Sequence, residues 1–510
     1  MELNRSAGIL LHPTSLPGPY GIGDLGDCAY RWVDFLFGTN CSLWQILPLG
    51  PTGFGDSPYQ CFSAMAGNPY LVSPYMLLKD GLLHSDDLVN LPEFPDHEVD
   101  FGKAIPFKLG ILDRSFHQFQ HSAPKEIKIE FEEFFSDQEE WLSDYALFMA
   151  IKEANGGVQW TKWESGLRNR VPSALKTARE KLNIAIQRQV YRQFLFFKQW
   201  KELKGYANRK GVTIIGDAPI FVSHDSVDVW VNRDLFFLDE SGEPTYVAGV
   251  PPDYFSPTGQ LWGNPLYNWD NHKRTGYKWW VARLKNVLSL VDIIRLDHFR
   301  GFAGYWEILG NAKTAEKGRW VKAPGFNFFK SIQQEIGGLP IIAEDLGVIT
   351  PDVEYIRDHF DLPGMKILQF AFEGKPSDPF LPHNYRRNCI VYTGTHDNDT
   401  AAGWFERVDE RAKKFCCNYL NCDGSEIAMD MVRACWGSVA VFSIAPMQDF
   451  LGLGNEARMN YPGNPSGNWR WRITTDLEDE QLVEKIRNLN YLFDRENPRK
   501  NNSDSKILSN

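Results

Sequence analysis

Residues 277–299 read YKWWVARLKNVLSLVDIIRLDHF and contain a helix followed directly by a strand. Over Tyr277–Ser289 the apolar residues recur every three to four positions, which is the period of an amphipathic helix. Val291–Phe299 then carries an apolar, β-branched run typical of a strand that is buried on both faces, as strands of parallel sheets are. The stretch therefore predicts one helix–strand unit of a parallel α/β sheet.

The same pattern recurs along the chain and gives eight candidate strands. They are Ala7–Leu16, Ser42–Gly50, Val212–Val222, Val291–Phe299, Leu339–Leu346, Met365–Phe372, Cys389–Asp397 and Val439–Met447. Segments with helical periodicity, such as Asp27–Gly38 and Asn327–Ile336, separate several of them. Alternating strands and helices predict parallel βαβ units. Eight such units predict an α/β fold of the (β/α)8 TIM-barrel class.

Two long insertions between candidate strands interrupt this alternation. The first covers about residues 52–211 and is rich in helical patterns, including the amphipathic segments Tyr145–Glu153 and Gln187–Leu203. The second covers residues 223–290 and is dense in Pro, Gly, Tyr and Trp. Loops of this length inside a barrel usually build the substrate site. We therefore expect the second insertion to cover a substrate.

The rest of the domain organisation follows from the end of the chain. About 60 residues follow the last candidate strand, which is too few for a C-terminal β-sandwich of about 100 residues. Residues 497–510 are polar and are predicted to form a disordered tail. We expect residues 1–496 to form a single catalytic barrel with its two insertions and no C-terminal β-sandwich.

Composition excludes several classes of protein. Lys and Arg total 54 against 65 Asp and Glu, so a net charge of −11 argues against a nucleic-acid-binding surface. No run of roughly 18 apolar residues occurs, so neither a membrane span nor a membrane partner is expected. The N-terminal residues lack the pattern of a signal peptide, and the eight cysteines are scattered without a C-x-x-C pair. These features predict a cytoplasmic protein.

Aromatic residues are abundant, with 17 Trp, 19 Tyr and 34 Phe in 510 residues. Their flat apolar faces suit a large core, and they suit stacking on sugar rings equally well. Trp279 and Trp280 lie in a helical pattern and are expected to pack between elements. A second group lies in a Pro- and Gly-rich loop, where sugar stacking explains them better. This group consists of Tyr254, Phe255, Trp262, Tyr267 and Trp269.

Three candidate strands end in carboxylates, at the end of the barrel where such enzymes place their chemistry. In the fourth strand, Arg295 and Asp297 are two positions apart and share a face. An ionised Asp297 beside a guanidinium could act as a nucleophile. Glu344 follows an apolar run, and burial could hold it protonated as a general acid. Asp397 could stabilise the positive charge of the transition state, and His396 could bind a sugar hydroxyl. This set meets the needs of retaining glycoside chemistry, in which the carboxyl groups of the nucleophile and the general acid lie about 5–5.5 Å apart.

The pattern leaves two choices and one alternative open. Glu344 cannot be separated from Asp345 on sequence alone, nor Asp397 from Asp399. The same carboxylates could also form a salt-bridged barrel rim without any catalytic role.

Three of the blocks just described resemble the catalytic blocks of the 4-α-glucanotransferases. These blocks are RLDHFRG (295–301), AEDLG (343–347) and GTHDNDT (394–400). The family, glycoside hydrolase family 77, includes amylomaltase and the disproportionating enzyme of plants and is related to the α-amylases. The resemblance continues through SLPGPYGIGDLG (15–26), DSPYQ (56–60), GDAPIFV (216–222) and GVPPDYF (249–255). It extends over roughly residues 7–472.

The resemblance implies a role for each matching residue. Asp297 is expected to be the nucleophile, Glu344 the acid/base and Asp397 the transition-state stabiliser. The subsite for the attacked glucose is expected to contain Tyr59, Asp217, Arg295 and His396. A loop over residues 249–267 is expected to cover the cleft and to bring Asp253, Phe255, Gln260 and Trp262 to the substrate. Phe54 stands where some relatives have Tyr at a secondary glucan contact, so a hydrogen bond is lost there.

The expected activity is that of a hexosyltransferase of starch, glycogen or maltodextrin metabolism. Such an enzyme moves a segment of a 1,4-α-glucan to the 4-hydroxyl of an acceptor glucan or glucose through a covalent intermediate. A hydrolase of the α-amylase type is the alternative, because water can intercept the same intermediate. A sugar-binding barrel without catalysis is a third possibility, but all three carboxylates are present. The chemistry requires no metal and no cofactor.

Overall fold

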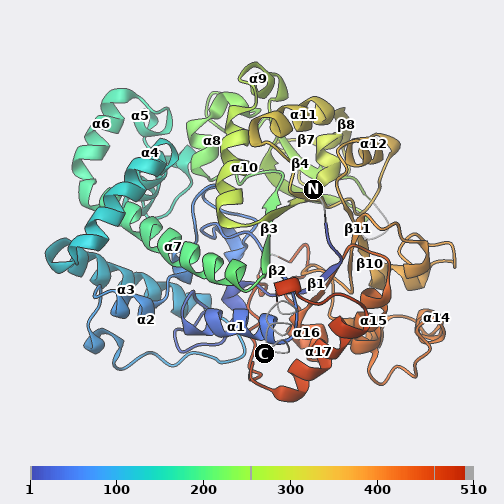
Figure 1. Ribbon diagram of the computed structural model, residues 1–510. Helices are drawn as coiled ribbons and strands as arrows, with labels where there is room; N and C mark the ends of the chain where they lie inside the picture. Colours follow the sequence, from blue (N-terminus) through green and yellow to red (C-terminus); the bar gives the residue numbers. More distant parts are fainter. Residues whose placement is uncertain (1–2, 253–255, 465, 500–510) are drawn as a thin grey trace.

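The computed structural model describes residues 3–252, 256–464 and 466–499. Eight parallel strands form the centre of the molecule, and each overlaps one of the eight predicted segments (Figure 1). They are β1 (Ser6–Leu10), β2 (Leu43–Gln45), β3 (Thr213–Pro219), β6 (Ile293–Asp297), β9 (Ile341–Ala343), β10 (Gly364–Ile367), β11 (Cys389–Tyr392) and β12 (Phe442–Pro446). Nearly all of their residues are buried, as expected for parallel strands covered on both faces.

The strands are arranged in the order β10-β11-β12-β1-β2-β3-β6-β9, and every neighbouring pair is parallel. The two outer strands meet, since the Ala343 amide of β9 donates a hydrogen bond of 2.9 Å to the carbonyl of Pro363, next to β10. The sheet thus closes into the predicted (β/α)8 barrel. Its register places Asp217 beside Arg295 and Pro219 beside Asp297, so β3 and β6 end at the same level.

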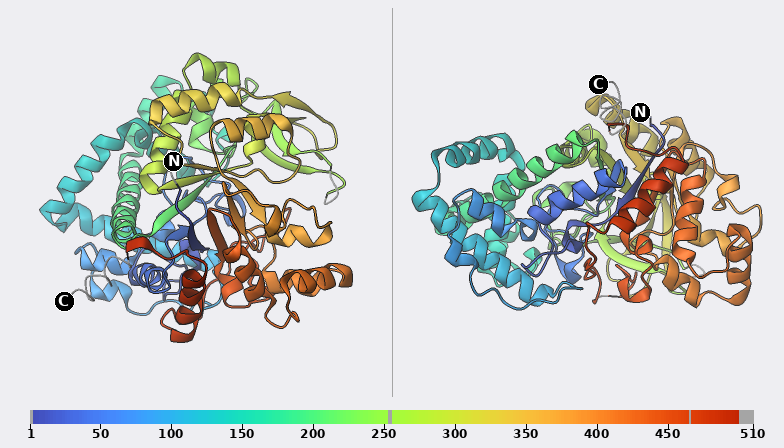
Figure 2. Two further views of the ribbon diagram at one scale, coloured as in Figure 1. Left: turned by 45° about the vertical axis from the view of Figure 1, so that its right-hand side comes forward. Right: turned by 60° about the horizontal axis from the view of Figure 1, so that its bottom comes forward.

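Helices surround this barrel (Figures 1 and 2). Three of them coincide closely with the predicted helices: α1 (Asp27–Gly38), α10 (Lys278–Leu290) and α11 (Gly325–Ile336). Aromatic side chains fill the space between strands and helices. The rings of Trp44 on β2 and Trp200 on α7 (Asn183–Arg209), for example, lie 6.1 Å apart between centroids. None of the helices among the described residues is long and apolar enough to cross a bilayer.

The first insertion is largely helical, as the sequence indicates. It contains α3 (Phe101–Ser122) and α4 (Lys125–Ala154), which pack with α7 at one side of the barrel (Figure 1). The predicted amphipathic segments Tyr145–Glu153 and Gln187–Leu203 lie within α4 and α7. The apolar face of α7 also meets α3 in an aromatic cluster that includes Phe119 of α3 and Tyr191 of α7, whose ring centroids lie 4.7 Å apart.

A second, smaller sheet lies beside the barrel and was not predicted. It is antiparallel, with the strand order β5-β4-β7-β8. Its strands are β4 (Tyr246–Val250), β5 (Gln260–Pro265), β7 (Gly304–Leu309) and β8 (Gly318–Lys322). The second insertion therefore folds partly as a sheet rather than as loops alone. Its central pairing joins Tyr246 to Leu309, across a long sequence separation that a local pattern does not reveal.

The C-terminal segment, residues 480–499, packs against the end of the barrel opposite to the strand ends that carry the carboxylates. After β12 the described residues form helices and turns, including α17 (Glu480–Leu492), but no further sheet. Asn497, the first residue of the predicted tail, is fully buried. Its amide N–H donates to the carbonyl of Asn40, and its side chain donates to those of Cys41 and Lys210. Residues 497–499 thus belong to the packed structure, while 500–510 lie outside the described residues.

Candidate active site

The carboxyl ends of β3, β6 and β11 border a cleft of about 820 Å³. Six of the predicted site residues line it: Tyr59, Gln260, Trp262, Asp297, His396 and Asp397. Two more, Asp217 and Arg295, are buried and contact the first set, and Glu344 contacts the backbone beside Asp297. Asp253 and Phe255 lie outside the described residues. Nine of the eleven predicted residues are therefore brought together at one end of the barrel.

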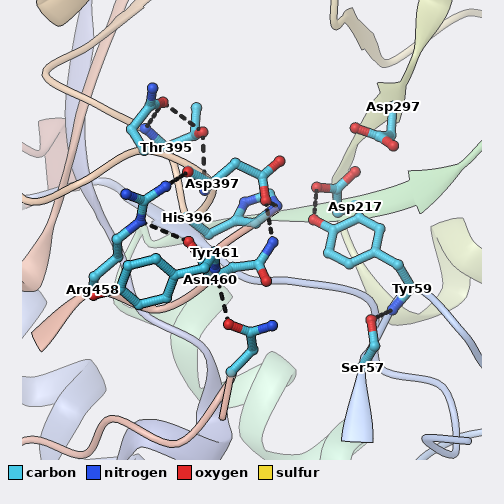
Figure 3. Close-up of polar contacts among 12 residues, drawn as sticks. Ser57, Tyr59, Asp217, Asp297, Thr395, His396, Asp397, Arg458, Asn460 and Tyr461 are labelled. Atoms are coloured by element: carbon cyan, nitrogen blue, oxygen red, sulfur yellow. Dashed lines mark hydrogen bonds and ion pairs between the residues drawn. The ribbon is translucent and has the colours of Figure 1, made fainter. Parts of the chain in front are cut away.

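Arg295 organises the first group of polar side chains. Its Nη1 lies 2.9 Å from Oδ1 of Asp297 and 2.5 Å from Oδ2 of Asp217. Tyr59 donates its hydroxyl to the same Asp217 oxygen at 2.7 Å (Figure 3). Burial raises the pKa of Asp217 to about 6, although the Arg295 charge opposes the rise. The guanidinium thus balances the charge of Asp297 and holds its carboxylate at the edge of the cleft, where the side chain keeps 29% of its exposure.

Glu344 follows β9 and lies next to the end of β6. Its Oε2 accepts the backbone N–H of His298 at 2.7 Å, and its Oε1 accepts that of Leu346 at 3.1 Å. Burial and the neighbouring charge of Asp297 raise the pKa of Glu344 well above its ordinary value. This shift favours the protonated form of the side chain beside a carboxylate, which is the form that a general acid needs.

His298 makes the turn that brings these two carboxyl groups together. Its backbone has a φ of 51°, in the left-handed region that non-glycine residues rarely adopt. Strand β6 ends at Asp297, and this conformation lets the next amide donate to Glu344. The imidazole of His298 packs edge-on against Trp262, with ring centroids 4.8 Å apart, so the second insertion is fixed to the same turn.

Asp397 lies opposite Asp297 in the cleft, on the connection after β11 (Figure 3). Its Oδ1 accepts a hydrogen bond of 2.6 Å from the side-chain amide of Asn460 and lies 3.4 Å from Nε2 of His396. The His396 ring stacks on Tyr59, with centroids 5.1 Å apart and planes 19° apart. Asp397 itself is half-exposed and open to a ligand.

The contacts of Asp345 and Asp399 differ from those of Glu344 and Asp397, the two pairs that the sequence leaves open. Asp345, the neighbour of Glu344, forms an ion pair of 2.6 Å with Arg357 and accepts the amide of Met365. Asp399 forms an ion pair with Arg407 and accepts a hydrogen bond from Asn455. Neither of them lines the cleft, whereas Asp397 lines it and Glu344 contacts the backbone beside Asp297.

Several cleft residues escaped the prediction. Asn460, Tyr461 and Trp469 come from the segment after β12, and Arg458 of this segment donates to the carbonyl of Asp397 at 2.7 Å. Trp469 has a φ of 66°, and its ring lies 5.7 Å from that of Tyr59. The only signal for this group is a cluster of Asn, Pro, Gly and Trp far from the carboxylate motifs. Phe54 lies at the rim of the cleft and is 77% exposed, so its ring is available to solvent.

The chain is similar in sequence and in structure to known proteins of one family. The family model described as 4-alpha-glucanotransferase matches residues 11–478. The 4-alpha-glucanotransferase of Synechocystis sp. is 50% identical over 96% of this chain and 98% of its own, and that of Thermus thermophilus is 50% identical over 93% and 95%. The amylomaltase of Streptococcus agalactiae, solved in complex with acarbose, superimposes with a TM-score of 0.94 at 40% identity, covering 96% of this chain and all of the other.

Proposed function

The chain belongs to the 4-alpha-glucanotransferase family, and on this premise we propose that Asp297, Glu344 and Asp397 carry out its transfer reaction. The observation that carries the assignment is that Asp297, held by Arg295, lines the cleft directly beside Glu344, whose pKa is raised. The comparisons make the enzyme a glycosyltransferase and do not favour the hydrolase of the α-amylase type.

In the first step Asp297 attacks the anomeric carbon of the donor glucan and forms a covalent glycosyl ester. The bond between this carbon and the glycosidic oxygen breaks as Glu344 gives its proton to that oxygen, and the shortened glucan leaves. In the second step the Glu344 carboxylate takes the proton of an acceptor 4-hydroxyl, whose oxygen attacks the same carbon and releases Asp297. Two inversions at one carbon retain the α-configuration.

The remaining residues of the cleft support the transition state and the substrate. Asp397 is positioned by Asn460 and faces the cleft from the side opposite to Asp297, so its charge stabilises the oxocarbenium-like transition state. Trp262 and Tyr59 offer flat apolar surfaces for uncharged sugar rings. The streptococcal amylomaltase was solved with acarbose, and we propose that this chain binds α-1,4-glucans such as maltodextrins, starch or glycogen fragments in the matching cleft.

We propose the cytoplasm as the place of action. All eight cysteines are free thiols in the structure, which supports a reducing compartment.

The test is incubation of the protein with maltotriose, followed by chromatography of the products. Transfer gives glucose together with a series of longer glucans, whereas glucose and maltose alone would show hydrolysis. The variant Asp297→Asn should lose about 10⁴-fold or more of the rate, because no covalent intermediate can form. Asp345→Asn is the matched control: it removes a neighbouring strand-end carboxylate that does not line the cleft, and it should keep the activity while lowering stability.

A further inference from the structure

His12 is a buried histidine near the cleft that the mechanism above does not use. It follows β1 and is only 5% exposed. His12 and His396 both line a small cavity of about 20 Å³, whose polar walls include Ser15 and Thr395. A polar cavity of about this size holds one water molecule. The cavity therefore connects a residue outside the cleft with one inside it.

The hydrogen bonding of His12 fixes where its proton lies. The backbone N–H of Leu47 donates to Nδ1 of His12 at 3.2 Å, so this nitrogen must be an unprotonated acceptor. Burial, together with the charge that His396 would carry, lowers the pKa of His12 to about 3, so the ring is neutral at neutral pH. Its proton consequently lies on Nε2, on the side of the ring away from Leu47.

The two ring nitrogens of His396 differ in their surroundings. Its Nδ1 is buried and has no hydrogen-bond partner among the described residues. Its Nε2 lies 3.4 Å from the Asp397 carboxylate. A proton on Nε2 makes this contact attractive, whereas a proton on Nδ1 would turn the Nε2 lone pair toward a negative charge. The stacking of the ring on Tyr59 and its packing against Trp469 restrain a ring flip that would exchange the positions of the two nitrogens.

We propose that His12 is a positioning residue that sets the tautomer of His396. The Nε2–H of His12 donates to a single water in the shared cavity, and this water donates to Nδ1 of His396. His396 then keeps its proton on Nε2, where it faces Asp397 and can donate to a sugar hydroxyl. This inference rests on the proposed function, because the prepared donor serves the saccharide bound in that cleft.

Imidazole nitrogen NMR tests the proposal directly, in the full-length protein without substrate. The 11 histidines are labelled with ¹⁵N, and the His396 signals are assigned by their loss in His396→Gln. We expect a protonated Nε2 and an unprotonated Nδ1 in the wild type at pH 7. A wild-type His396 that carries its proton on Nδ1 would overturn the proposal.

Two variants separate positioning from mere packing. His12→Asn keeps an acceptor for Leu47 where Nδ1 stands but loses the donor at Nε2. His12→Gln places an amide donor where Nε2 stands. If His12 positions His396, the His396 tautomer changes in His12→Asn and is restored in His12→Gln. If His12 has only a structural role, His12→Gln is the more harmful of the two variants, because it loses the acceptor for Leu47. An unchanged tautomer in a folded His12→Asn would contradict the proposal.

Kinetics give a second readout. For maltotriose disproportionation, His12→Asn should lower kcat about tenfold with little change in KM, as expected when one hydrogen bond to the transition state is weakened. His12→Gln should recover most of this loss. If the wild type does not disproportionate maltotriose, the proposed function fails while the NMR result still decides on His12. If it does so and both variants match it, only the His12 inference fails.

Discussion

At the scale of single residues, the charges of Asp297 and Glu344 depend on each other. Glu344 is the group whose pKa is raised, by burial first and by the Asp297 charge second, while Arg295 opposes the rise. The first chemical step needs a protonated Glu344. Activity should therefore fall as the pH rises through the pKa of Glu344, which lies above the range of an ordinary carboxyl group.

We predict that Asp297→Asn lowers the pKa of Glu344, because the variant removes the negative charge that helps to raise it and leaves Arg295 in place. The measurement is a ¹³C NMR titration of the glutamate carboxyl groups. Asp345→Asn is the control, since Asp345 contributes less to the pKa of Glu344 and should change it less. A Glu344 pKa that stays the same or rises in Asp297→Asn would show that burial alone sets it.

At the scale of elements, one buried carboxylate holds both ends of the connection that carries His396 and Asp397. Asp449, in α16 (Met447–Phe450), accepts the Thr393 hydroxyl at 2.5 Å and the Ala401 amide at 2.7 Å. Thr393 follows β11, and Ala401 begins α13 (Ala401–Arg407). The connection between them is therefore tied to α16, the helix that directly follows β12.

This carboxylate should make stability depend on pH. Burial raises the native pKa of Asp449 to about 6 from the ordinary 3.8, so the native state binds its proton more tightly than the unfolded state does. Its contribution to stability is thus fully present below pH 4 and is lost as the pH rises through 6, by about 3 kcal/mol. In Asp449→Asn this loss should be absent. Urea unfolding of both proteins between pH 4 and 8 measures the free energy of unfolding at each pH. The prediction is wrong if this free energy changes with pH by the same amount in the wild type and in Asp449→Asn.

At the scale of the whole molecule, the C-terminal segment stabilises the end of the barrel that lies away from the cleft. Arg495 is fully buried and donates hydrogen bonds to the backbone carbonyls of Trp436, Ser6, Ser438, Ala440 and Val441. Asn497 then links the segment to the chain before β2 and before β3. The start of the barrel is held by residues from its far end in sequence.

Two truncations test this role. A chain that ends at Glu496 loses the bonds of Asn497 and should be less stable, by about 2–3 kcal/mol, than a chain that ends at Arg499. Thermal unfolding compares the two. Their kcat/KM values at a temperature where both are folded should agree, because this end of a barrel contributes stability rather than chemistry. Equal melting temperatures would show that the hydrogen bonds of Asn497 do not stabilise this end of the barrel.

The eight barrel strands, several of the helices around them and the strand ends that carry Asp297, Glu344 and Asp397 could be predicted from the sequence alone. These features are local: a β-branched run, a helical period or a carboxylate after an apolar run can be read within a few residues. The tertiary structure alone decided what depends on distant contacts. It distinguishes Asp345 and Asp399 from Glu344 and Asp397 by their contacts, because Asp345 and Asp399 form ion pairs with Arg357 and Arg407, which come from other segments. It also formed the small sheet through β4 and β7 and brought Asn460 and Trp469 into the cleft, since such pairings join residues far apart in the chain and leave no local pattern.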